Sequence, residues 1–373
     1  MNRTLPIPDL PAALMRLLQQ IPSGCVTTYG DLAEALGDLK AAKWVAAFLL
    51  EHDHGDDCPC FRVVRRTGEI GLYVGRDSRE KASRLRAEGV AVAEAASFRT
   101  DAGSVGHVAE AASFRTDAGS VAHVAEAASF RADAGSVGHV ADDRVDLRRF
   151  RFANFTGEQP LRALAERQHE IPNRVAFEPL DHTPELVAGV DVSYRGGSAF
   201  AAYAVVETAS GELVESHVVR RPVAFPYISG YLADRELPAL LAAVKSLPAR
   251  VPRAEIVFVD GNGLLHRRGA GIATHFGVVA GLRTIGVGKK LLCGTVNLDG
   301  LRQADSSAVT LEGRTVGAAV KAGSKSRPIF ISVGHRTTLP DAVRLTQLLF
   351  HGHRLPEPLY HADRLSREEA RGS

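Results

Sequence analysis

The stretch LVAGVDVSYRGGSAFAAYAVVE, residues 186–207, decides the fold class of the second half of the chain. Residues 186–194 form an apolar run, which predicts a buried strand. The following RGGS, residues 195–198, predicts a tight hairpin turn because glycine readily adopts the positive φ angles that such turns require. Residues 199–207 are apolar again and predict a second strand, so the whole stretch predicts a buried antiparallel hairpin.

Strands and helices alternate through the rest of this half, which predicts an α/β domain with a mixed sheet. Further strands are expected at residues 212–220, 255–259, 284–287 and 329–333, and helices at residues 228–247 and 341–350. The first half has a different pattern. Apolar residues at helical spacing predict helices over residues 11–20, 28–36 and 40–50, the second of them capped by Thr28.

The composition is that of a soluble globular protein of more than one domain. The chain has 373 residues, of which 45% are hydrophobic and 24% charged, and its net charge is +2, so any basic surface must be local. We expect no membrane contact, since no apolar stretch reaches the roughly 18 residues that span a bilayer. No signal sequence and no disulfide framework are recognisable. Cys58 and Cys60 form a C-x-C, which is not the usual C-x-x-C spacing of zinc or redox sites, and we expect a cytoplasmic protein with reduced thiols.

Three near-copies of a 16-residue sequence separate the two halves, at residues 92–107, 108–123 and 124–139. Each copy offers one large aromatic residue and little else to bury, which predicts a low-complexity tether. A small helical stack or a partner site is the alternative. We therefore expect an N-terminal domain over residues 1–91, a repeat linker over 92–150 that is disordered, and a C-terminal domain over 151–373.

Three carboxylates occupy positions that suggest a metal site. Asp191 lies inside the first apolar strand, and Asp260 ends the strand IVFVD before a glycine-rich turn. Glu236 lies on the predicted helix that follows Pro226. A carboxylate in an apolar strand is costly unless it is paired or binds a cation, and oxygen ligands suit Mg²⁺, with Mn²⁺ as a substitute. Each acid alone is more simply explained as a satisfied structural acid.

Two further residues fit the same hypothesis. His335 follows the apolar run IFISVGH, and we expect it at a strand end beside the acids, where it would orient water or bind the metal. Lys289, in TIGVGKK, would neutralise the charge that develops on a phosphate. A capping or core role is the alternative for the histidine.

The second half of the sequence resembles a known family, endonuclease V. The similarity is carried by LVAGVDVSY, FPYISGYLADRE, VFVDGNGLLHRRGAGIATHFG, TIGVGKK and ISVGHR with GHRLPEP, over about residues 156–363. The resemblance implies an RNase H-like fold and a metal-dependent endonuclease. It also implies hydrolysis of the second phosphodiester bond 3′ to a deaminated base, chiefly hypoxanthine, which leaves 3′-OH and 5′-phosphate ends.

The resemblance also assigns residues to roles. It places the metal on Asp191, Glu236 and Asp260, makes His335 and Lys289 catalytic, and makes Tyr227 a wedge that stacks where the lesion leaves the duplex. The remaining substrate-binding residues it implies are Gly261, His266, Gly271 and Ile272. Without the flanking motif, Tyr227 would be read as a half-buried core tyrosine, and the glycines as residues that serve only their turn.

The first half resembles the DNA-binding domain of O6-alkylguanine-DNA alkyltransferases and their alkyltransferase-like relatives, a winged-helix-like module. The similarity covers about residues 8–90 and includes IPSGCVTTYGDLA, KAAKWVAA and CPCFRVV. Cys60 and Glu88 match the family's alkyl acceptor and glutamate, but Phe61 stands where the activating histidine is expected. The resemblance makes Tyr29, Lys43 and Arg62 DNA-binding residues, with lysine in place of the arginine finger.

These observations leave several functions open. The first hypothesis is a DNA repair endonuclease that acts on DNA with deaminated bases, tethered to a module that binds DNA or alkylated guanine. The second is an alkylated-DNA sensor, or a methyl acceptor through Cys60, in which the nuclease half is secondary. The third is a ribonuclease that acts on inosine-containing RNA, since sequence does not report contacts with the 2′-OH. The sequence does not predict an oligomeric state.

Overall fold

The computed structural model describes residues 7–53, 55, 57–73, 77–94, 143–302 and 305–373. The chain forms two compact units, one of Asp9–Arg162 and one built on Ala163–Ser373. Among the described residues, no helix has both the length and the apolar character that a bilayer crossing requires.

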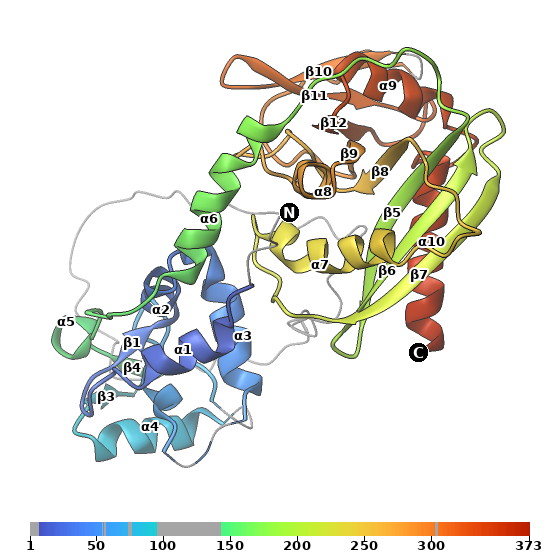
Figure 1. Ribbon diagram of the computed structural model, residues 1–373. Helices are drawn as coiled ribbons and strands as arrows, with labels where there is room; N and C mark the ends of the chain where they lie inside the picture. Colours follow the sequence, from blue (N-terminus) through green and yellow to red (C-terminus); the bar gives the residue numbers. More distant parts are fainter. Residues whose placement is uncertain (1–6, 54, 56, 74–76, 95–142, 303–304) are drawn as a thin grey trace. The chain divides into compact units, whose positions relative to one another are not determined.

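The C-terminal unit contains an eight-stranded sheet in the order β10-β11-β12-β9-β8-β5-β6-β7 (Figure 1). Parallel pairing links β5 to β8 and β8 to β9, and the other neighbours are antiparallel, which confirms the mixed sheet. The strands are β5 (Leu186–Arg195), β6 (Ser198–Glu207), β7 (Leu213–Pro222), β8 (Ile256–Asp260), β9 (Arg283–Gly288), β10 (Ser306–Leu311), β11 (Arg314–Val320) and β12 (Ile329–His335).

The opening hairpin forms as the sequence predicts. Strands β5 and β6 pair from Leu186 with Glu207 to Arg195 with Ser198. The two residues between them, Gly196 and Gly197, have φ angles of 54° and 74°. A two-residue turn with both φ angles positive matches the right-handed twist of its strands, and glycine adopts it without steric strain.

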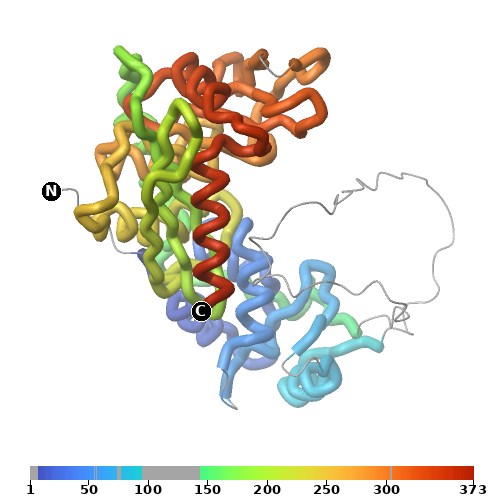
Figure 2. Tube along the Cα trace, turned by 90° about the vertical axis from the view of Figure 1, so that its right-hand side faces the viewer, coloured from blue at the N-terminus to red at the C-terminus, as the bar shows by residue number. Residues whose placement is uncertain are grey.

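Helices cover both faces of the sheet. On one face α7 (Leu232–Lys245) and α8 (Ile272–Ala280) pack on β5 residues Val190 and Val192. On the other face α9 (Leu339–Leu348) and α10 (Glu357–Gly372) pack on Val187. Figure 2 shows α10, in red, running along this face. Because successive side chains on a strand point to opposite faces, Asp191 points to the α10 side.

The N-terminal unit is mainly helical, as expected. Its helices are α1 (Leu10–Leu18), α2 (Tyr29–Ala35), α3 (Ala42–Glu51) and α4 (Ser78–Ala87), and short strands β1 (Thr27–Thr28) and β2 (Val63–Val64) pair in parallel. Thr28 is the N-cap of α2, where its hydroxyl accepts from the backbone N–H of Asp31 and the Asp31 carboxylate accepts from the N–H of Thr28. This reciprocal capping satisfies donors that the first helical turn leaves unpaired.

The segment after the repeats returns to the N-terminal unit. Strand β3 (Val92–Ala93) pairs antiparallel with β4 (Arg144–Val145), and the backbone N–H of Val145 donates to Gly68 O at 2.9 Å. Farther along, Arg151 forms an ion pair with Asp31. The segment also contributes the short helix α5 (Leu147–Phe150), and α6 (Pro160–Glu170) follows.

Most of the repeat sequence, residues 95–142, lies outside the described residues. The chain on either side of it is described, and it belongs to one unit. The described chain therefore ends at Glu94 and resumes at Asp143 within one unit, so the residues that flank the repeats do not belong to different units, as a connector between the two halves would require. The expected domain boundary at residues 150 and 151 also falls inside the N-terminal unit, which ends at Arg162.

Candidate active site

Three aspartates from three elements come together near the end of the central strand β8 of the C-terminal sheet. They are Asp191 in β5, Asp260 at the end of β8 and Asp363 in α10, and one carboxylate oxygen from each lies within 4.8 Å of the others. The parallel register pairs Val190 with Val259, which sets Asp191 beside Asp260. Helix α10 crosses the same face and brings in the third acid.

Helix α10 also orients the buried acid of β5. The hydroxyl of Ser366, one turn beyond Asp363, donates to Asp191 Oδ2 at 3.0 Å. Ser366 lies 2.8 Å from Ser193 Oγ as well, so it connects the helix to two positions on the same face of β5. Asp191 is 5% exposed, and a carboxylate so far from water needs such partners.

Lys289 is a basic residue in contact with two of the three acids. Its Nζ lies 2.5 Å from Asp260 Oδ2 and 3.4 Å from Asp363 Oδ1. Burial raises the pKa of Asp260 to about 6 and the neighbouring charge of Asp191 adds to the increase, whereas Lys289 opposes it. Burial alone would lower the pKa of Lys289, but Asp260 and Asp191 outweigh this effect and hold it above its usual value. The lysine is therefore charged at neutral pH.

The donor set fits a hard divalent cation. Carboxylates at this spacing repel one another: the charge of Asp191 adds to the rise that burial causes in the pKa of Asp260, and a dication would remove this repulsion. All the clustered ligand atoms are oxygens, which favour Mg²⁺ or Mn²⁺ over softer metals. Two members of the cluster, Asp191 and Asp260, are sites predicted from the sequence.

The third predicted ligand, Glu236, is not a member of this cluster. It lies on α7, on the opposite face of the sheet, and accepts a hydrogen bond of 3.2 Å from Tyr194 OH. The Arg235 guanidinium lies 4.2 Å from the centroid of the same tyrosine ring. Glu236 is only 8% exposed, so it is a buried acid that approaches the end of β5 from the α7 side.

The expectation that His335 lies beside the acids is wrong. His335 ends β12, but β12 runs antiparallel to β9, and His335 pairs with Thr284 near the start of that strand. Thr284 in turn pairs with Val257, three residues before Asp260. Three residues of strand span about 10 Å, so His335 emerges toward the opposite end of the sheet.

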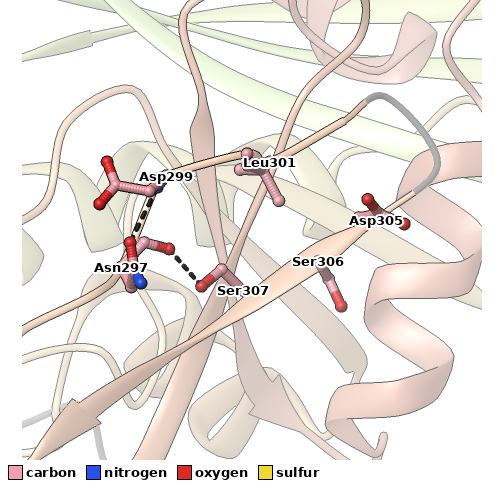
Figure 3. A pocket seen from close by; sticks show the side chains of 7 residues that line it. Asn297, Asp299, Leu301, Asp305, Ser306 and Ser307 are labelled. Carbon is pink, nitrogen blue, oxygen red and sulfur yellow. Dashed lines mark hydrogen bonds between the residues drawn. The ribbon is translucent and has the colours of Figure 1, made fainter.

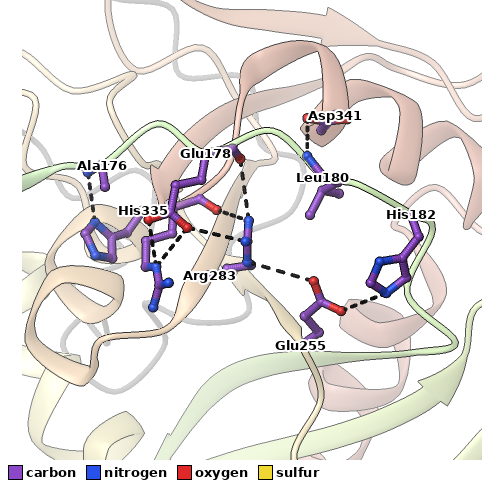
Figure 4. Close-up of polar contacts among 9 residues, drawn as sticks. Ala176, Glu178, Leu180, His182, Glu255, Arg283, His335 and Asp341 are labelled. Carbon is purple, nitrogen blue, oxygen red and sulfur yellow. Dashed lines mark hydrogen bonds and ion pairs between the residues drawn. The ribbon is translucent and has the colours of Figure 1, made fainter.

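The contacts of His335 indicate a structural role. Its Nδ1 accepts from the backbone N–H of Ala176 at 3.3 Å, and Figure 4 shows it next to an ion-pair network formed by Glu178, Arg283 and Glu255. Burial, followed by the charge of Arg336, lowers the pKa of His335. This histidine is a neutral residue that fixes the chain near residue 176.

Tyr227 is exposed where its neighbours are buried. It is 46% exposed, whereas Phe225, Ile228 and Tyr231 in the same loop are at most 2% exposed. The buried residues anchor the loop and leave the one aromatic ring free to contact a partner. This arrangement differs from that of a half-buried core tyrosine and is compatible with the wedge role.

The glycines of the loop after β8 serve close packing. A Cβ on Gly261 would lie 2.3 Å from Ile272 Cγ2, and one on Gly271 would lie 2.0 Å from Asn262 O. Ile272 is 2% exposed and belongs to the core of the α7 face, so its side chain is not open to a base in this conformation. His266 Nδ1 accepts from the backbone N–H groups of Arg268 and Ala270 at 3.2 and 3.4 Å, which orients its ring within the loop.

Asp363 is the member of the site that sequence reasoning missed. The sequence around it, EPLYHADRLSREEARG, is amphipathic and begins after a proline, which are signs of a helix. Asp363 lies next to Ala362 and three residues before Ser366, both fully buried. The position of Asp363 beside the apolar face of this amphipathic pattern could have marked it as a candidate site residue.

The N-terminal residues expected to bind DNA occupy different environments. Lys43 is exposed on α3, as a DNA contact requires. Arg62 forms an ion pair with Glu88, and its guanidinium also donates to Ile21 O at 2.7 Å. Tyr29 is partly buried at the start of α2, and burial raises the pKa of its hydroxyl.

Cys60 lies in surroundings that disfavour its thiolate. It is 4% exposed, and the hydrogen bond with Cys58 and burial hold the pKa of Cys60 far above its usual value. The guanidinium carbons of Arg62 and Arg84 lie 5.2 and 5.8 Å from the centroid of the Phe61 ring. Glu88, which would orient a histidine at that position, is instead engaged by Arg62 and by the N–H of Gly24.

A separate pocket lies in the chain between β9 and β10. Figure 3 shows its lining, which includes Asn297, Asp299, Asp305 and Ser307, and none of the clustered aspartates contributes to it. Ser307 Oγ donates to Asn297 O at 2.5 Å, and the N–H of Asp299 donates to Asn297 Oδ1 at 2.8 Å. These carboxylates make the pocket unsuitable for a polyanion.

Two family models match the sequence. The one described as Endonuclease V covers residues 169–364, and the one described as 6-O-methylguanine DNA methyltransferase, DNA binding domain, covers residues 9–90. These matches confirm both resemblances seen in the sequence.

Individual relatives agree with the first match. Endonuclease V of Azotobacter vinelandii is 44% identical over 208 residues, which is 54% of this chain and 91% of that protein. The crystal structure of the catalytic domain of human endonuclease V is 34% identical, with a TM-score of 0.53 over 58% of this chain and 98% of that one.

Endonuclease V of Ciona intestinalis was solved in complex with a 24mer DNA that contains an inosine followed by a ribo-adenosine. It is 27% identical, with a TM-score of 0.52 over 58% of this chain and 99% of that one. The acid cluster, the mixed sheet and these relatives together show that the chain belongs to the endonuclease V family, as a metal-dependent endonuclease of RNase H-like fold with an N-terminal alkyltransferase-type DNA-binding domain.

Proposed function

We propose that this protein cleaves nucleic acid next to inosine with a hard divalent cation, Mg²⁺ in the cell, held by Asp191, Asp260 and Asp363. The observation that carries the proposal is the mutual approach of these three acids within 4.8 Å in a member of this family. Glu236 is proposed as a further acid that acts from the α7 side. The inosine-containing DNA in the Ciona intestinalis complex supports the choice of substrate.

When bound, the cation would polarise the scissile phosphodiester and activate water. The chain supplies the rest. An ammonium group has three N–H donors, and Lys289 directs two toward Asp260 and Asp363, which leaves one for a phosphate oxygen. Ser366 holds Asp191 in a fixed orientation, so the acids need little rearrangement when substrate arrives.

Substrate recognition is proposed to begin at Tyr227. An exposed aromatic ring on an anchored loop can stack on the base pairs next to a displaced inosine and replace part of the lost stacking. Gly261, His266, Gly271 and Ile272 lie in or beside the loop that leads from Asp260 and are proposed to adjust around the displaced base. Cleavage is proposed at the second phosphodiester bond 3′ to the lesion, with 3′-OH and 5′-phosphate products.

The test is a cleavage assay with a duplex that carries one inosine and labels on both ends. The parent protein with Mg²⁺ should give one product pair, whose sizes report the cleaved bond and whose ends report the phosphate. Matched controls are the same duplex with adenosine and the Asp191→Asn variant. An uncut inosine duplex, with inosine-containing single-stranded RNA also uncut, would overturn the proposal. Cutting of the RNA alone would assign the activity to RNA.

For the N-terminal unit we propose DNA binding without alkyl transfer by Cys60. The observations that favour it are the exposed Lys43 and the buried thiol whose pKa is raised. Because the thiolate is the nucleophile, a thiol held protonated reacts slowly. Incubation with DNA that carries a radiolabelled O6-methylguanine should leave the protein unlabelled while a gel-shift assay shows binding. Transfer of the label to Cys60 would make the protein a methyl acceptor instead.

A further inference from the structure

Two cysteines and a histidine lie together in the N-terminal unit, outside the proposed nuclease site. The Sγ atoms of Cys58 and Cys60 and a ring nitrogen of His52 lie within 4.8 Å of one another. His52 Nε2 and Cys58 Sγ are 3.3 Å apart. His52 directly follows the last residue of α3, and the cysteines flank Pro59 at the start of a short 3₁₀ turn over Pro59–Arg62.

The histidine is held in one tautomer by the helix that precedes it. Its Nδ1 lies 3.2 Å from Leu49 O, and because a carbonyl oxygen only accepts, Nδ1 must carry the proton. In the neutral ring Nε2 then carries the lone pair, and this atom faces Cys58 Sγ. A backbone carbonyl that fixes the far nitrogen is the usual support of a metal-binding histidine.

Burial determines what charge the cluster can hold. Cys58 and Cys60 are 6% and 4% exposed. Two buried thiolates would be costly without a counter-charge, and the buried Lys81, whose charge acts on Cys60, supplies at most one positive charge. A divalent cation held directly by both sulfur atoms would stabilise both thiolates. A neutral imidazole adds a donor without changing the net charge.

The geometry points to a binding site for a thiophilic divalent cation, with His52, Cys58 and Cys60 as ligands. We propose Zn²⁺ as this cation, because thiolate and imidazole ligands suit it. Tetrahedral zinc with its usual Zn–N and Zn–S bond lengths sets neighbouring ligand atoms about 3.5 to 3.8 Å apart, which small side-chain movements would reach from the present positions. Three ligands are found among the described residues, and a fourth donor, such as water, would complete a tetrahedral site. Softness of the thiolates separates this site from the all-oxygen cluster of the nuclease unit.

The three ligands do not follow a familiar zinc-binding sequence motif. The C-x-C of Cys58 and Cys60 lacks the usual spacing of a zinc motif, and only the fold brings His52 against it. The inference stands independently of the proposed nuclease activity, since it concerns a different unit and different ligand atoms. Two other arrangements could explain the proximity of these side chains: a Cys58–Cys60 disulfide, or a thiol–imidazole hydrogen bond without metal.

The experiment uses the full chain, reduced, freed of metal and then titrated with Co²⁺ as a spectroscopic substitute for Zn²⁺. The expected result is one equivalent bound with a sulfur-to-cobalt charge-transfer band and the strong visible absorption of a tetrahedral site. Added Zn²⁺ should abolish both signals. Cobalt at the carboxylate cluster gives no such band, so the readout is specific to the thiols.

Variants assign the ligands. Cys58→Ser and Cys60→Ser should lose the charge-transfer band. His52→Gln should bind cobalt at least tenfold more weakly than the parent. Cys25→Ser and Cys293→Ser are matched controls that should retain it. A second measurement that does not depend on the folding of a variant uses the parent alone: bound Zn²⁺ should protect Cys58 from iodoacetamide, as mapped by mass spectrometry, but not Cys25.

Several outcomes would overturn the inference. One is a reduced parent protein that binds no cobalt with a charge-transfer band. Another is a Cys58→Ser spectrum identical to that of the parent. A third is protein isolated without reductant in which Cys58 and Cys60 form a disulfide, and which after reduction shows no protection by Zn²⁺.

Discussion

Lys289 lies 2.5 Å from Asp260 Oδ2 and 3.4 Å from Asp363 Oδ1, so one ammonium group connects the end of strand β8 to helix α10. The positive charge of this group is stabilised by both carboxylates. A lysine there competes electrostatically with the metal and also positions a donor for the phosphate. Its removal should therefore separate metal binding from catalysis.

We expect Lys289→Met to bind Mg²⁺ more tightly than the parent and to cleave an inosine duplex more slowly. The affinity rises because a competing positive charge is lost, and the rate falls roughly 100-fold because a donor to the transition state is lost. Thermal unfolding at increasing Mg²⁺ measures the first effect and single-turnover cleavage the second. Lys290→Met is the matched control. A variant with weaker Mg²⁺ binding would contradict this account.

Asp363 and His335 should behave oppositely on substitution. Asp363→Asn removes a charged ligand from the cluster and should slow cleavage by more than about 100-fold, since a catalytic metal contributes several kcal/mol. His335→Gln should cleave within about threefold of the parent, because this side chain bonds the backbone of Ala176 and lies away from the acids. If the His335→Gln variant were inactive but had the melting temperature of the parent, the histidine would act in the reaction.

The raised pKa of Asp260 predicts a pH effect on stability in the absence of divalent cations. The pKa of about 6 lies above the ordinary value of 3.8, so the folded protein holds this proton more tightly than the unfolded chain. The contribution of this group to the free energy of unfolding therefore rises as the pH falls from about 6 to about 4, and it is constant above that range.

Asp260→Asn isolates this contribution. In EDTA the variant should be more stable than the parent at pH 7, and the difference should shrink toward pH 4, where the parent's Asp260 is protonated. Urea unfolding at several pH values gives both curves. Parallel curves for parent and variant would show that Asp260 titrates normally. With Mg²⁺ present, the parent should lose metal affinity below about pH 6, because protons and metal compete for the same oxygens.

Tyr227→Ala should weaken binding to inosine duplexes without lowering the melting temperature, because the ring is largely exposed. Base stacking on an aromatic side chain contributes about 1 to 3 kcal/mol, which corresponds to a roughly 5- to 150-fold loss of affinity. Tyr227→Phe keeps the ring and should bind like the parent. The measurement is fluorescence anisotropy with EDTA in place of Mg²⁺, so that the duplex is not cleaved. Equal affinities for Tyr227→Ala and the parent would remove the wedge role.

Removal of residues 95–142, with an Asn-Gly turn joining Glu94 to Asp143, should leave cleavage of inosine duplexes unchanged. The cut ends lie next to the paired strands β3 and β4, so the shorter connection strains neither. The N-terminal unit should become more stable, since each halving of a loop lowers its closure cost by roughly 0.6 kcal/mol. A large loss of cleavage on long duplexes would show that the repeats contribute to function.

The sequence predicts those parts of the fold that depend on local patterns. The apolar runs on either side of Gly196 and Gly197 predict the β5–β6 hairpin, and Thr28 predicts the start of α2, because turn geometry and capping involve neighbouring residues only. Asp191 and Asp260 were also identifiable, since each acid interrupts or ends an apolar run.

Properties that depend on strand direction and long-range pairing were not predictable in the same way. His335 ends a strand just as Asp260 does, but no local pattern states that β12 runs antiparallel to β9. Asp363 joins the cluster only because α10 crosses the face of β5, some 170 residues earlier in the chain. The pairing of β3 with β4 across the repeats is likewise a tertiary event.

That pairing has a consequence for how the gene can change. Near-identical tandem copies are prone to slippage during replication, and each gain or loss of a whole copy adds or removes 16 residues without a shift of reading frame. In a connector between the two units, such events would alter their separation. Here the chain enters and leaves the copies through adjacent strands of one unit, so alleles with two copies or five would encode the same metal centre and the same path between the units.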